Sequence, residues 1–491
     1  MFEKYKKVYK ADYEKWYKEN EAYRERVAAD PDRLKFHLMP KTGWLNDPNG
    51  LCQFNGTYHI YYQYTPFEPT GELKTWGHYT TKDFIHYEDF GPVVFPDEDM
   101  DAHGVYSGSA FIEDDTIHYF YTGNLKYFDR DDYDYINSGR GSNTITFTSK
   151  DGYKFTPKEL LMTTNDYPAD MSNHVRDPKI FKKNEKYYMV LGARDVEGVG
   201  MILLYESTDL KNWTYKNRIT TPQKFGYMWE CPDLFEMDGQ LYIICCPQGV
   251  ETQGIDYENV HQVTAMKLDY DFDTDEYEIT DIKLFDRGFD FYAPQTFGGL
   301  DNKTHAVLFG WIGLPDLTYP TDKFKWHSAL TLPRELRLEG TKIYQRPIAK
   351  IYENLTALSA LHLDEKTDIA NLDRAYIKFE AKNQAFDLTF FQNEKGQSLR
   401  LSYENGLVCL DRSQSEQTEL MEKFDTKRFC EVENLQTVEI FFDRSIIEIF
   451  FNQGEKAMTS RFFIENRENT ISSTRPLDLM FGYLPAIQYD K

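Results

Sequence analysis

Long apolar runs are missing from this sequence of 491 residues. No segment approaches the ~18 consecutive apolar residues that a membrane-spanning helix needs. Residues 1–30 carry Lys and Glu throughout and lack the apolar centre of a secretory signal. These absences argue against a membrane protein built from helices, and they predict a soluble protein that stays in the cytoplasm.

Cysteine is also sparse, with six residues in the chain, and no pair of them has the spacing of a metal site. The 11 histidines are scattered, without an HExxH pattern. We therefore expect reduced thiols and no bound metal. The six residues are Cys52, Cys231, Cys245, Cys246, Cys409 and Cys430.

Basic residues are outnumbered, because 56 Lys and Arg face 80 Asp and Glu and leave a formal net charge of -24. No block of Lys or Arg interrupts this excess. The balance argues against nucleic acid or an anionic membrane as the main partner and favours a small ligand. A phosphorylated ligand would need a local cationic pocket to overcome repulsion by the net negative charge of the protein.

Aromatic residues are abundant, with 36 Tyr and 35 Phe. They favour β-sheet interiors and surfaces that stack on sugar rings, so the predicted class is all-β. The length predicts one large domain and a smaller one. Residues 3–28 contain no Gly or Pro and predict one or two amphipathic helices, within an N-terminal extension over residues 1–34.

A repeated pattern decides the predicted architecture of residues 35–345. A short polar motif precedes an aromatic or β-branched strand five times. A second signature, such as TTKDFIHYE from Thr80, recurs in the same order in the earlier repeats. Such repeats predict a five-bladed β-propeller. The motifs are NDPNG at 46–50, SGSA at 107–110, RDPK at 176–179, ECPD at 230–233 and APQT at 293–296, and the strands are 58–64, 117–121, 186–191, 240–245 and 304–311.

The pattern changes after the repeats. Residues 346–360 are predicted to be a linker, with a helical segment over 351–361. Residues 361–491 show long alternating runs with turn residues between them, which predict a C-terminal β-sandwich.

Three carboxylates, Asp47, Asp177 and Glu230, occupy equivalent motifs in three of the repeats. The segment around Asp47 is also typical of a tight turn. The inner strands of a propeller face its central channel, however, so the three side chains are predicted to converge there. Hydrolysis of an acetal needs one carboxylic acid and one carboxylate, and a third can bind sugar hydroxyls.

The motifs WLNDPNG at 44–50, RDP at 176–178 and Glu230-Cys231 resemble those of glycoside hydrolase family 32, the invertases and fructanases. Further similar segments are YSGSA at 106–110, FYAPQTF at 291–297, LTLPREL at 330–336 and SIIEIFFNQGE at 445–455. The resemblance spans nearly the whole chain in order. It implies a five-bladed propeller followed by a sandwich, and a retaining release of fructose through a covalent intermediate without a cofactor.

The same resemblance assigns roles to residues. It implies that Asp47 is the nucleophile, Glu230 the general acid and base, and Asp177 the group that stabilises the transition state. It further implies that a set of mainly aromatic and polar residues lines the sugar pocket. That set is Trp44, Asn46, Gln63, Trp76, Tyr106, Ser107, Arg176, Tyr292 and Trp311.

Local surroundings predict how the carboxylates ionise. Glu230 stands beside Trp229 and Cys231, which predicts desolvation and a protonated carboxyl near neutral pH. Asp47 stands among Asn46 and Asn49, which predicts an ionised carboxylate.

The identity of the sugar is left open by the sequence. Segments such as 101–110 and 311–320 resemble intracellular bacterial sucrose-6-phosphate hydrolases most, whereas Trp44 and the Trp76-Gly77-His78 triplet resemble the invertase form. Sucrose, sucrose 6-phosphate and short fructo-oligosaccharides all stay candidates. A phosphate would need a cation, for which the candidates are Lys74, His78, Arg140 and Lys325.

Three other functions stay open at this point. A propeller can bind a glycan without cutting it, because a fold does not prove an activity. An inverting hydrolase would use the same residue types at a wider spacing. A fructosyltransferase would pass the fructosyl group to a sugar and not to water.

Overall fold

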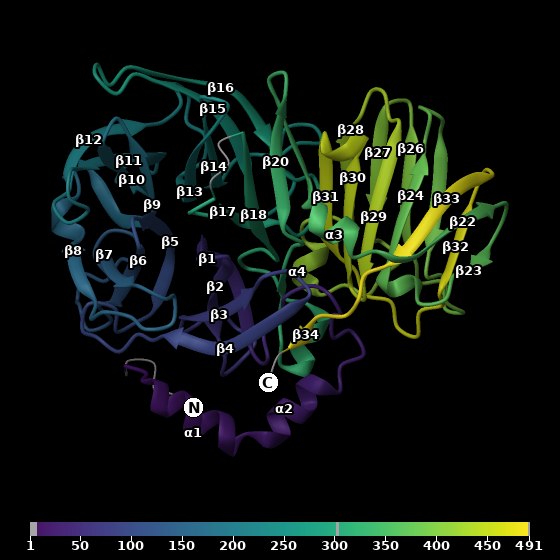
Figure 1. Ribbon diagram of the computed structural model, residues 1–491, viewed down its shortest axis with the longest axis horizontal. Helices are drawn as coiled ribbons and strands as arrows, with labels where there is room; N and C mark the ends of the chain where they lie inside the picture. Colours follow the sequence, from purple (N-terminus) through teal and green to yellow (C-terminus); the bar gives the residue numbers. More distant parts are fainter. Residues whose placement is uncertain (1–6, 301–303, 490–491) are drawn as a thin grey trace.

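The computed structural model describes residues 7–300 and 304–489, which form seven β-sheets and a few short helices. Two α-helices open the chain, α1 (Lys10–Glu19) and α2 (Glu21–Ala28), as the composition of this segment predicts. They lie beside the first sheet (Figure 1). Within the described ranges, no helix is long and apolar enough to cross a membrane.

Aromatic contacts hold these two helices on the body of the protein. Trp16 of α1 packs edge-on against Phe67, with ring centroids 5.1 Å apart. Val27 of α2 is buried in a cluster with Trp326 and Ile446. The helices therefore brace segments that lie far apart in the sequence.

The first five sheets are each built around strands that follow one another in the chain and pair antiparallel. Figure 1 shows them around a common centre. They are β1 (Trp44–Phe54), β2 (Thr57–Thr65), β3 (Thr75–Thr81) and β4 (His86–Val94); β5 (Val105–Glu113), β6 (Thr116–Lys126), β7 (Arg140–Ser149) and β8 (Glu159–Met162); β9 (Met171–Lys183), β10 (Lys186–Asp195), β11 (Gly200–Ser207) and β12 (Thr214–Ile219); β13 (Met228–Met237), β14 (Gln240–Gln248), β15 (Thr264–Tyr270) and β16 (Tyr277–Leu284); and β17 (Tyr292–Thr296), β18 (His305–Ile312), β19 (Ala329–Leu330), β20 (Arg334–Glu339) and β21 (Lys342–Pro347).

The first strands of these sheets contact one another in turn. β1 packs on β5, β5 on β9, β9 on β13, β13 on β17, and β17 on β1. Side chains also join first strands that are not adjacent in this ring. Gln295 of β17 donates to the backbone oxygen of Gly108 in β5 over 2.8 Å. Between adjacent strands, Lys179 of β9 pairs with Asp233 of β13 at 3.1 Å. The five first strands therefore surround one centre.

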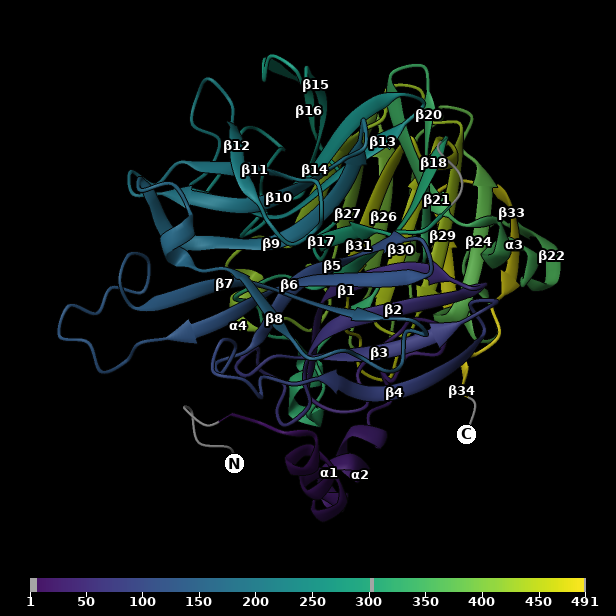
Figure 2. The same ribbon diagram turned by 60° about the vertical axis from the view of Figure 1, so that its left-hand side comes forward.

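Two six-stranded sheets pack beside this body (Figures 1 and 2). Their inner faces carry alternating buried residues such as Ile377, Leu401 and Ile440, the pattern of a sandwich core. In spatial order the strands are β22 (Thr356–Leu363), β33 (Leu477–Tyr483), β24 (Ala375–Glu380), β29 (Thr437–Asp443), β30 (Ile446–Phe451) and β31 (Lys456–Arg461); and β23 (Thr367–Asp368), β32 (Thr470–Ser473), β25 (Phe386–Phe390), β26 (Leu399–Glu404), β27 (Leu407–Asp411) and β28 (Lys427–Glu431).

The connection between the two parts differs from the prediction. Helix α3 covers only Ala349–Glu353, and β22 occupies most of the segment 351–361 that was predicted to be helical. β22 lies at the edge of its sheet, where it pairs only with β33, and most of its residues are exposed. The remaining short helices are α4 (Glu419–Glu422) and the 3₁₀ turns Thr164–Asp166, Pro320–Phe324, Leu372–Arg374 and Asn452–Gly454.

The last described strand leaves the sandwich. β34 (Gln488–Tyr489) pairs in parallel with β4 of the first sheet (Figure 2). The alternating pattern of residues 361–491 gave no sign of this return, because a two-residue strand carries no periodic signal. This pairing connects the last described strand to the first sheet.

A buried polar network joins the sandwich to the first five sheets. The ring nitrogens of His37 contact Asp443 (Nδ1 to Oδ2, 2.9 Å) and Glu448 (Nε2 to Oε1, 2.8 Å). Glu448 also accepts from Nε of Arg334 over 3.0 Å. All four side chains are shielded from solvent. Paired charges of this kind fix the relative position of two bodies because their partners cannot be exchanged for water.

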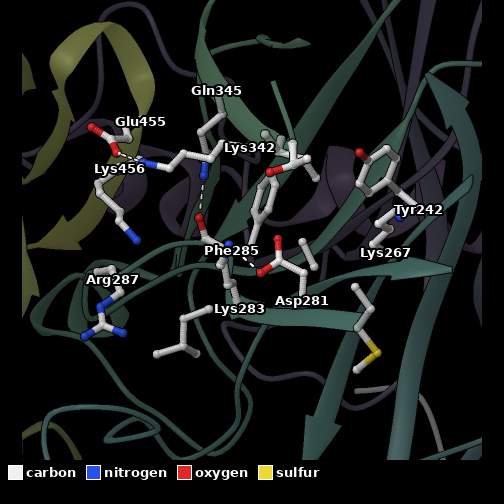
Figure 3. Close-up of a pocket in the computed structure, with 16 residues that line it drawn as sticks. Tyr242, Lys267, Asp281, Lys283, Phe285, Arg287, Lys342, Gln345, Glu455 and Lys456 are labelled. Atoms are coloured by element: carbon white, nitrogen blue, oxygen red, sulfur yellow. Dashed lines mark hydrogen bonds and ion pairs between the residues drawn. The ribbon is translucent and has the colours of Figure 1, made fainter. Parts of the chain in front are cut away.

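A cavity of about 150 Å³ lies at the interface between the sandwich and the first five sheets, where the edge strands β16, β21 and β31 meet (Figure 3). Lys342 of β21 pairs with Glu455, the residue before β31, at 2.6 Å. Lys283 pairs with Asp281 within β16 at 2.5 Å. Both carboxylates that line this cavity are thus neutralised by a lysine.

Candidate active site

Each of the five first strands carries a β-bulge at its polar motif. The pairing registers shift between Leu45 and Pro48, Val105 and Gly108, Arg176 and Lys179, Glu230 and Asp233, and Tyr292 and Gln295. A bulge leaves one residue unpaired and re-aims the side chains around it. Four of the five bulges contain a proline, which has no N–H to lose from a ladder. The prolines are Pro48, Pro178, Pro232 and Pro294.

The bulges bring the predicted carboxylates together. Asp47 of β1, Asp177 of β9 and Glu230 of β13 line one cavity of about 180 Å³, which we call the central cavity. Eight of the nine predicted sugar-binding residues line it as well. They are Trp44, Asn46, Gln63, Tyr106, Ser107, Arg176, Tyr292 and Trp311.

Trp76 does not line the central cavity, although the resemblance placed it there. Its side chain is completely buried between the first two sheets, against Tyr121 and Phe147. Its indole Nε1 donates to the backbone oxygen of Tyr106 over 3.0 Å. Trp76 therefore supports a cavity residue from behind.

Asp47 is held at the end of a chain of hydrogen bonds. Ser107 donates to Oδ2 of Asp47 over 2.5 Å and accepts from Nε2 of Gln63 over 2.7 Å. Asn46 donates to Oδ1 of Asp47 over 3.0 Å and also to Gln63. These bonds orient both carboxylate oxygens of Asp47. Trp44 donates from its indole to Asn46 over 3.0 Å and so continues the chain.

Glu230 is surrounded by donors. Arg176 donates to Oε1 from Nη2 over 2.6 Å and from Nε over 3.2 Å. Gln248 and the hydroxyl of Tyr292 each donate to Oε2 over 2.7 Å. Nη1 of Arg176 donates to Nδ1 of His174 over 2.7 Å, so the guanidinium is anchored on both sides.

The direction of the pKa shift of Glu230 is opposite to the prediction from the sequence, whereas the ionised state of Asp47 stays a prediction. Burial opposes the charge of Glu230, but the nearby Arg176 outweighs it and lowers the pKa of Glu230. Burial raises the pKa of Asp47, a rise that Ser107 limits and that repulsion from Glu230 increases. The prediction considered only Trp229 and Cys231, the neighbours of Glu230 along the chain. The pKa of Glu230 is determined instead by Arg176, which lies across the cavity.

Asp177 has a left-handed backbone, with φ of 65°. Such a conformation is uncommon for a residue with a side chain and concentrates at functional sites. Its Oδ2 accepts from the backbone N–H of Cys231 over 2.9 Å, and Nε of Arg176 lies 3.9 Å away. Burial raises the pKa of Asp177 to about 7, although Arg176 opposes the rise. Asp177 is therefore about half protonated near neutral pH.

Two of the four cations considered for a phosphate line the central cavity, namely Lys74 and Arg140. The other two do not. His78 stacks on Tyr61 with ring centroids 3.9 Å apart. Lys325 lies near α2, where its amine is 6.0 Å from the ring centroid of Tyr23.

Two lining residues, Tyr135 and Pro315, were not predicted. Pro315 lies in the segment WIGLPDLTYP, whose resemblance to the family was a usable signal. Tyr135 belongs to an acidic loop between β6 and β7, and nothing in the pattern of that loop indicates a site. Among residues 7–300 and 304–489, no group of three or more His, Cys, Asp or Glu side chains is arranged to hold a metal.

Known proteins are similar to this chain in sequence and in fold. The N-terminal domain model of glycosyl hydrolases family 32 matches residues 37–347, and the C-terminal model of that family matches residues 339–475. The sucrose-6-phosphate hydrolase of Staphylococcus xylosus is 35% identical over 485 residues, which cover 95% of this chain and 94% of that protein. The enzyme of the same name from Vibrio alginolyticus is 38% identical over 439 residues, which cover 88% and 86%.

A solved structure of a related protein is also similar to this chain. The sucrose-6-phosphate hydrolase from Lactobacillus gasseri matches with a TM-score of 0.88 and 28% identity, and the match covers 99% of each chain. Sequence and fold agree from one end of the chain to the other. This chain belongs to glycosyl hydrolase family 32.

Proposed function

We propose that this protein is a retaining β-fructofuranosidase that releases fructose from sucrose 6-phosphate, sucrose or short fructo-oligosaccharides. The observation that carries the proposal is the convergence of three carboxylates, Asp47, Asp177 and Glu230, in one cavity with indole and phenol rings. Aromatic rings of this kind suit the apolar faces of sugars. The names of the relatives from Staphylococcus xylosus and Vibrio alginolyticus support sucrose 6-phosphate among these substrates.

In the proposed reaction, Asp47 attacks the anomeric carbon of the fructosyl unit. The bond to the leaving oxygen breaks, and Glu230 transfers its proton to that oxygen. Glu230 then accepts a proton from water, whose oxygen attacks the anomeric carbon and releases Asp47. Two displacements at one carbon retain the configuration. Arg176 and Tyr292 hold Glu230 in position for both proton transfers.

The proton required for the first step has a proposed source in the cluster itself. The raised pKa of Asp177, about 7, means that this carboxyl is about half protonated near neutral pH and can supply a proton to the cluster. Fructose hydroxyls that donate to Asp177 favour its ionised form. We infer that binding of substrate then shifts the proton towards Glu230.

We further propose that the five sheets of residues 35–345 are the blades of a propeller and that residues 361–491 form the sandwich domain, after an extension over 1–34 and a linker over 346–360. The ring of contacts among the five first strands supports this division. A cytoplasmic location is also a proposal, which the six free cysteines support.

The test is to compare fructose release from sucrose, sucrose 6-phosphate, 1-kestose and inulin with the purified protein. We expect hydrolysis of at least one of the first two, and nuclear magnetic resonance should detect the β-anomer of fructose first. Early appearance of the α-anomer would contradict retention. Product analysis at high sucrose distinguishes hydrolysis from transfer of the fructosyl group to a sugar acceptor. If the protein binds these sugars without cleaving them, the proposed enzymatic activity is contradicted.

A further inference from the structure

Tyr135 is the most exposed aromatic residue that lines the central cavity. Trp44 is 9% exposed, and Tyr292 and Trp311 are 2% exposed each. Tyr135, by contrast, is 43% exposed. The buried rings therefore lie inside the cavity, and Tyr135 lies at its mouth, where a bound ligand would meet solvent.

The size of the central cavity limits what it can enclose. Its volume is about 180 Å³, whereas pockets that enclose a drug-sized ligand measure roughly 300–1,000 Å³. The cavity therefore suits a single sugar unit. In the proposed reaction this is the fructosyl unit, bound at Asp47, Asp177 and Glu230. The unit that leaves must then lie at the mouth of the cavity.

A chain of contacts runs from Glu230 to Tyr135. Arg176 donates from Nη2 to Glu230 over 2.6 Å and from Nη1 to Nδ1 of His174 over 2.7 Å. The rings of His174 and Tyr135 pack edge to face, with centroids 5.2 Å apart. In the proposed reaction Glu230 protonates the oxygen of the leaving unit, so that unit starts beside Glu230. Tyr135 therefore lies on the side of the cavity from which it departs.

The loop between β6 and β7, residues 127–139, holds Tyr135 in place before a ligand enters. The N–H of Asn173 on β9 donates to the backbone oxygen of Ile136 over 2.9 Å, which fastens the loop to the third sheet. The buried Arg140 donates from Nη1 to the hydroxyl of Tyr135 over 3.1 Å. A side chain restrained in this way loses little conformational entropy when a ligand packs against it.

We propose that Tyr135 is a specificity-determining residue, whose ring packs against the ring of the sugar that leaves. This inference rests on the proposed function, since it places the fructosyl unit at the three carboxylates. The face of a tyrosine ring and the C–H face of a pyranose are both apolar, so they pack together. The hydroxyl accepts from Arg140 and keeps its own O–H for a sugar oxygen. Tyr135 then favours fructosides that release a second sugar over those that release a small alcohol.

The test measures kcat/KM on two substrates and compares their ratio between variants. One substrate is sucrose or sucrose 6-phosphate, whichever the wild type cleaves faster. The other is methyl β-fructofuranoside, whose leaving methanol is too small to reach Tyr135. Tyr135→Ala is expected to lower the ratio of the first to the second about 3- to 10-fold, the scale of one aromatic contact. The change should appear mainly in KM, because the ring contacts the leaving sugar in the ground state and in the transition state alike.

Tyr133→Ala is the matched control. Tyr133 belongs to the same loop and is 42% exposed, but it stacks on Phe128, with ring centroids 6.1 Å apart, and does not line the central cavity. Its ratio should equal that of the wild type. Tyr135→Phe should keep most of the wild-type ratio, because the ring remains.

Two results would overturn the role of Tyr135. One is an unchanged ratio in Tyr135→Ala, which includes an equal loss on both substrates from a disturbed loop. The other is a ratio in Tyr135→Phe as low as that in Tyr135→Ala, which would assign the effect to the hydroxyl and not to the ring. A wild-type protein that releases fructose from none of these substrates would refute the proposed function instead.

Discussion

Arg176 and Glu230 are 54 positions apart in the sequence, yet Nη2 of the arginine lies 2.6 Å from Oε1 of the glutamate. This contact lowers the pKa of Glu230, whereas burial raises the pKa of Asp47 and that of Asp177. It also fixes the carboxyl group whose proton the proposed reaction moves twice.

Glu230→Gln should lower turnover on sucrose on the order of 10²-fold or more, the usual scale for a positioned acid or base. The loss should be smaller on a fructoside with a good leaving group, because protonation of the leaving oxygen matters less there. Azide, which needs no general base, should then restore turnover and yield fructosyl azide of retained configuration. Steady-state rates with and without azide check this.

Glu236→Gln is the control for that variant, because Glu236 lies on the same strand but pairs with Lys183 outside the central cavity. It should behave as the wild type. Equal losses on good and poor leaving groups, or no response to azide, would mean that another group is the acid and base.

Asp47→Ala should abolish fructose release, a loss on the order of 10⁴-fold or more, because the covalent route needs this carboxylate. The circular dichroism spectrum should stay that of the wild type, since a cavity side chain supports little of the core. Asp115→Ala removes a carboxylate from the turn between β5 and β6 and should keep full activity. Wild-type turnover in Asp47→Ala would exclude Asp47 as the nucleophile.

Ser107→Ala removes the hydroxyl that donates to Asp47 over 2.5 Å. Burial already raises the pKa of Asp47, and Ser107 counteracts it, so the pKa should rise further. The ionised form then requires a higher pH, and the acid limb of the profile of kcat/KM against pH should move upward. At acidic pH the loss should be about 10-fold.

Ser109→Ala is matched to that variant, because Ser109 lies two residues further along β5 and donates to the backbone oxygen of Pro178 over 2.7 Å. Its acid limb should stay in place. If both variants kept the wild-type profile, the hydrogen bond from Ser107 would have no part in the ionisation of Asp47.

Asp177→Asn should stabilise the protein more at pH 8 than at pH 5. The pKa of Asp177 is raised to about 7 in the folded state, above the ordinary carboxyl value near 4. The folded state therefore binds more protons than the unfolded state between these values, and stability falls as pH rises through them. The difference should be on the order of 2 kcal/mol, read from melting temperatures, whereas activity is lost. A pH-independent shift would contradict the raised pKa.

His37→Gln should weaken the junction between the sandwich and the first five sheets. Burial opposes the charge of His37, but Asp443 and Glu448 outweigh it and raise its pKa to about 9. This stabilisation is complete below the ordinary pKa near 6.5 and disappears as pH rises through 9, and it amounts to roughly 3 kcal/mol. Melting temperatures at pH 6 and pH 9.5 check it.

The exposed His362, which pairs with Asp478 at 2.6 Å, is the control for that variant. His362→Gln should leave the melting temperature nearly unchanged at both pH values. An equal loss at pH 6 and pH 9.5 in His37→Gln would show that packing, and not charge, holds the junction.

The sequence by itself determined the all-β class, the repeat that places a polar motif on each first strand, and the three carboxylates. Those features are local, since Pro and Gly mark the bulges and alternation marks the strands. Eight of the nine expected sugar-binding residues line the central cavity. Six of them belong to these motifs or directly precede them, whereas Gln63 and Trp311 lie on the second strands β2 and β18. Trp76 does not line the central cavity, because a sequence motif does not specify which face of a strand is turned towards the cavity.

Only the tertiary structure decided how the site ionises and which cations reach it. The pKa values of Glu230 and Asp47 depend on groups brought close by folding, and the sequence neighbours of Glu230 predicted the opposite direction of its shift. Lys74 and Arg140 line the central cavity, whereas His78 and Lys325 do not, for the same reason. Electrostatic interactions act through space, so distances across the fold determine them and the order of residues along the chain does not.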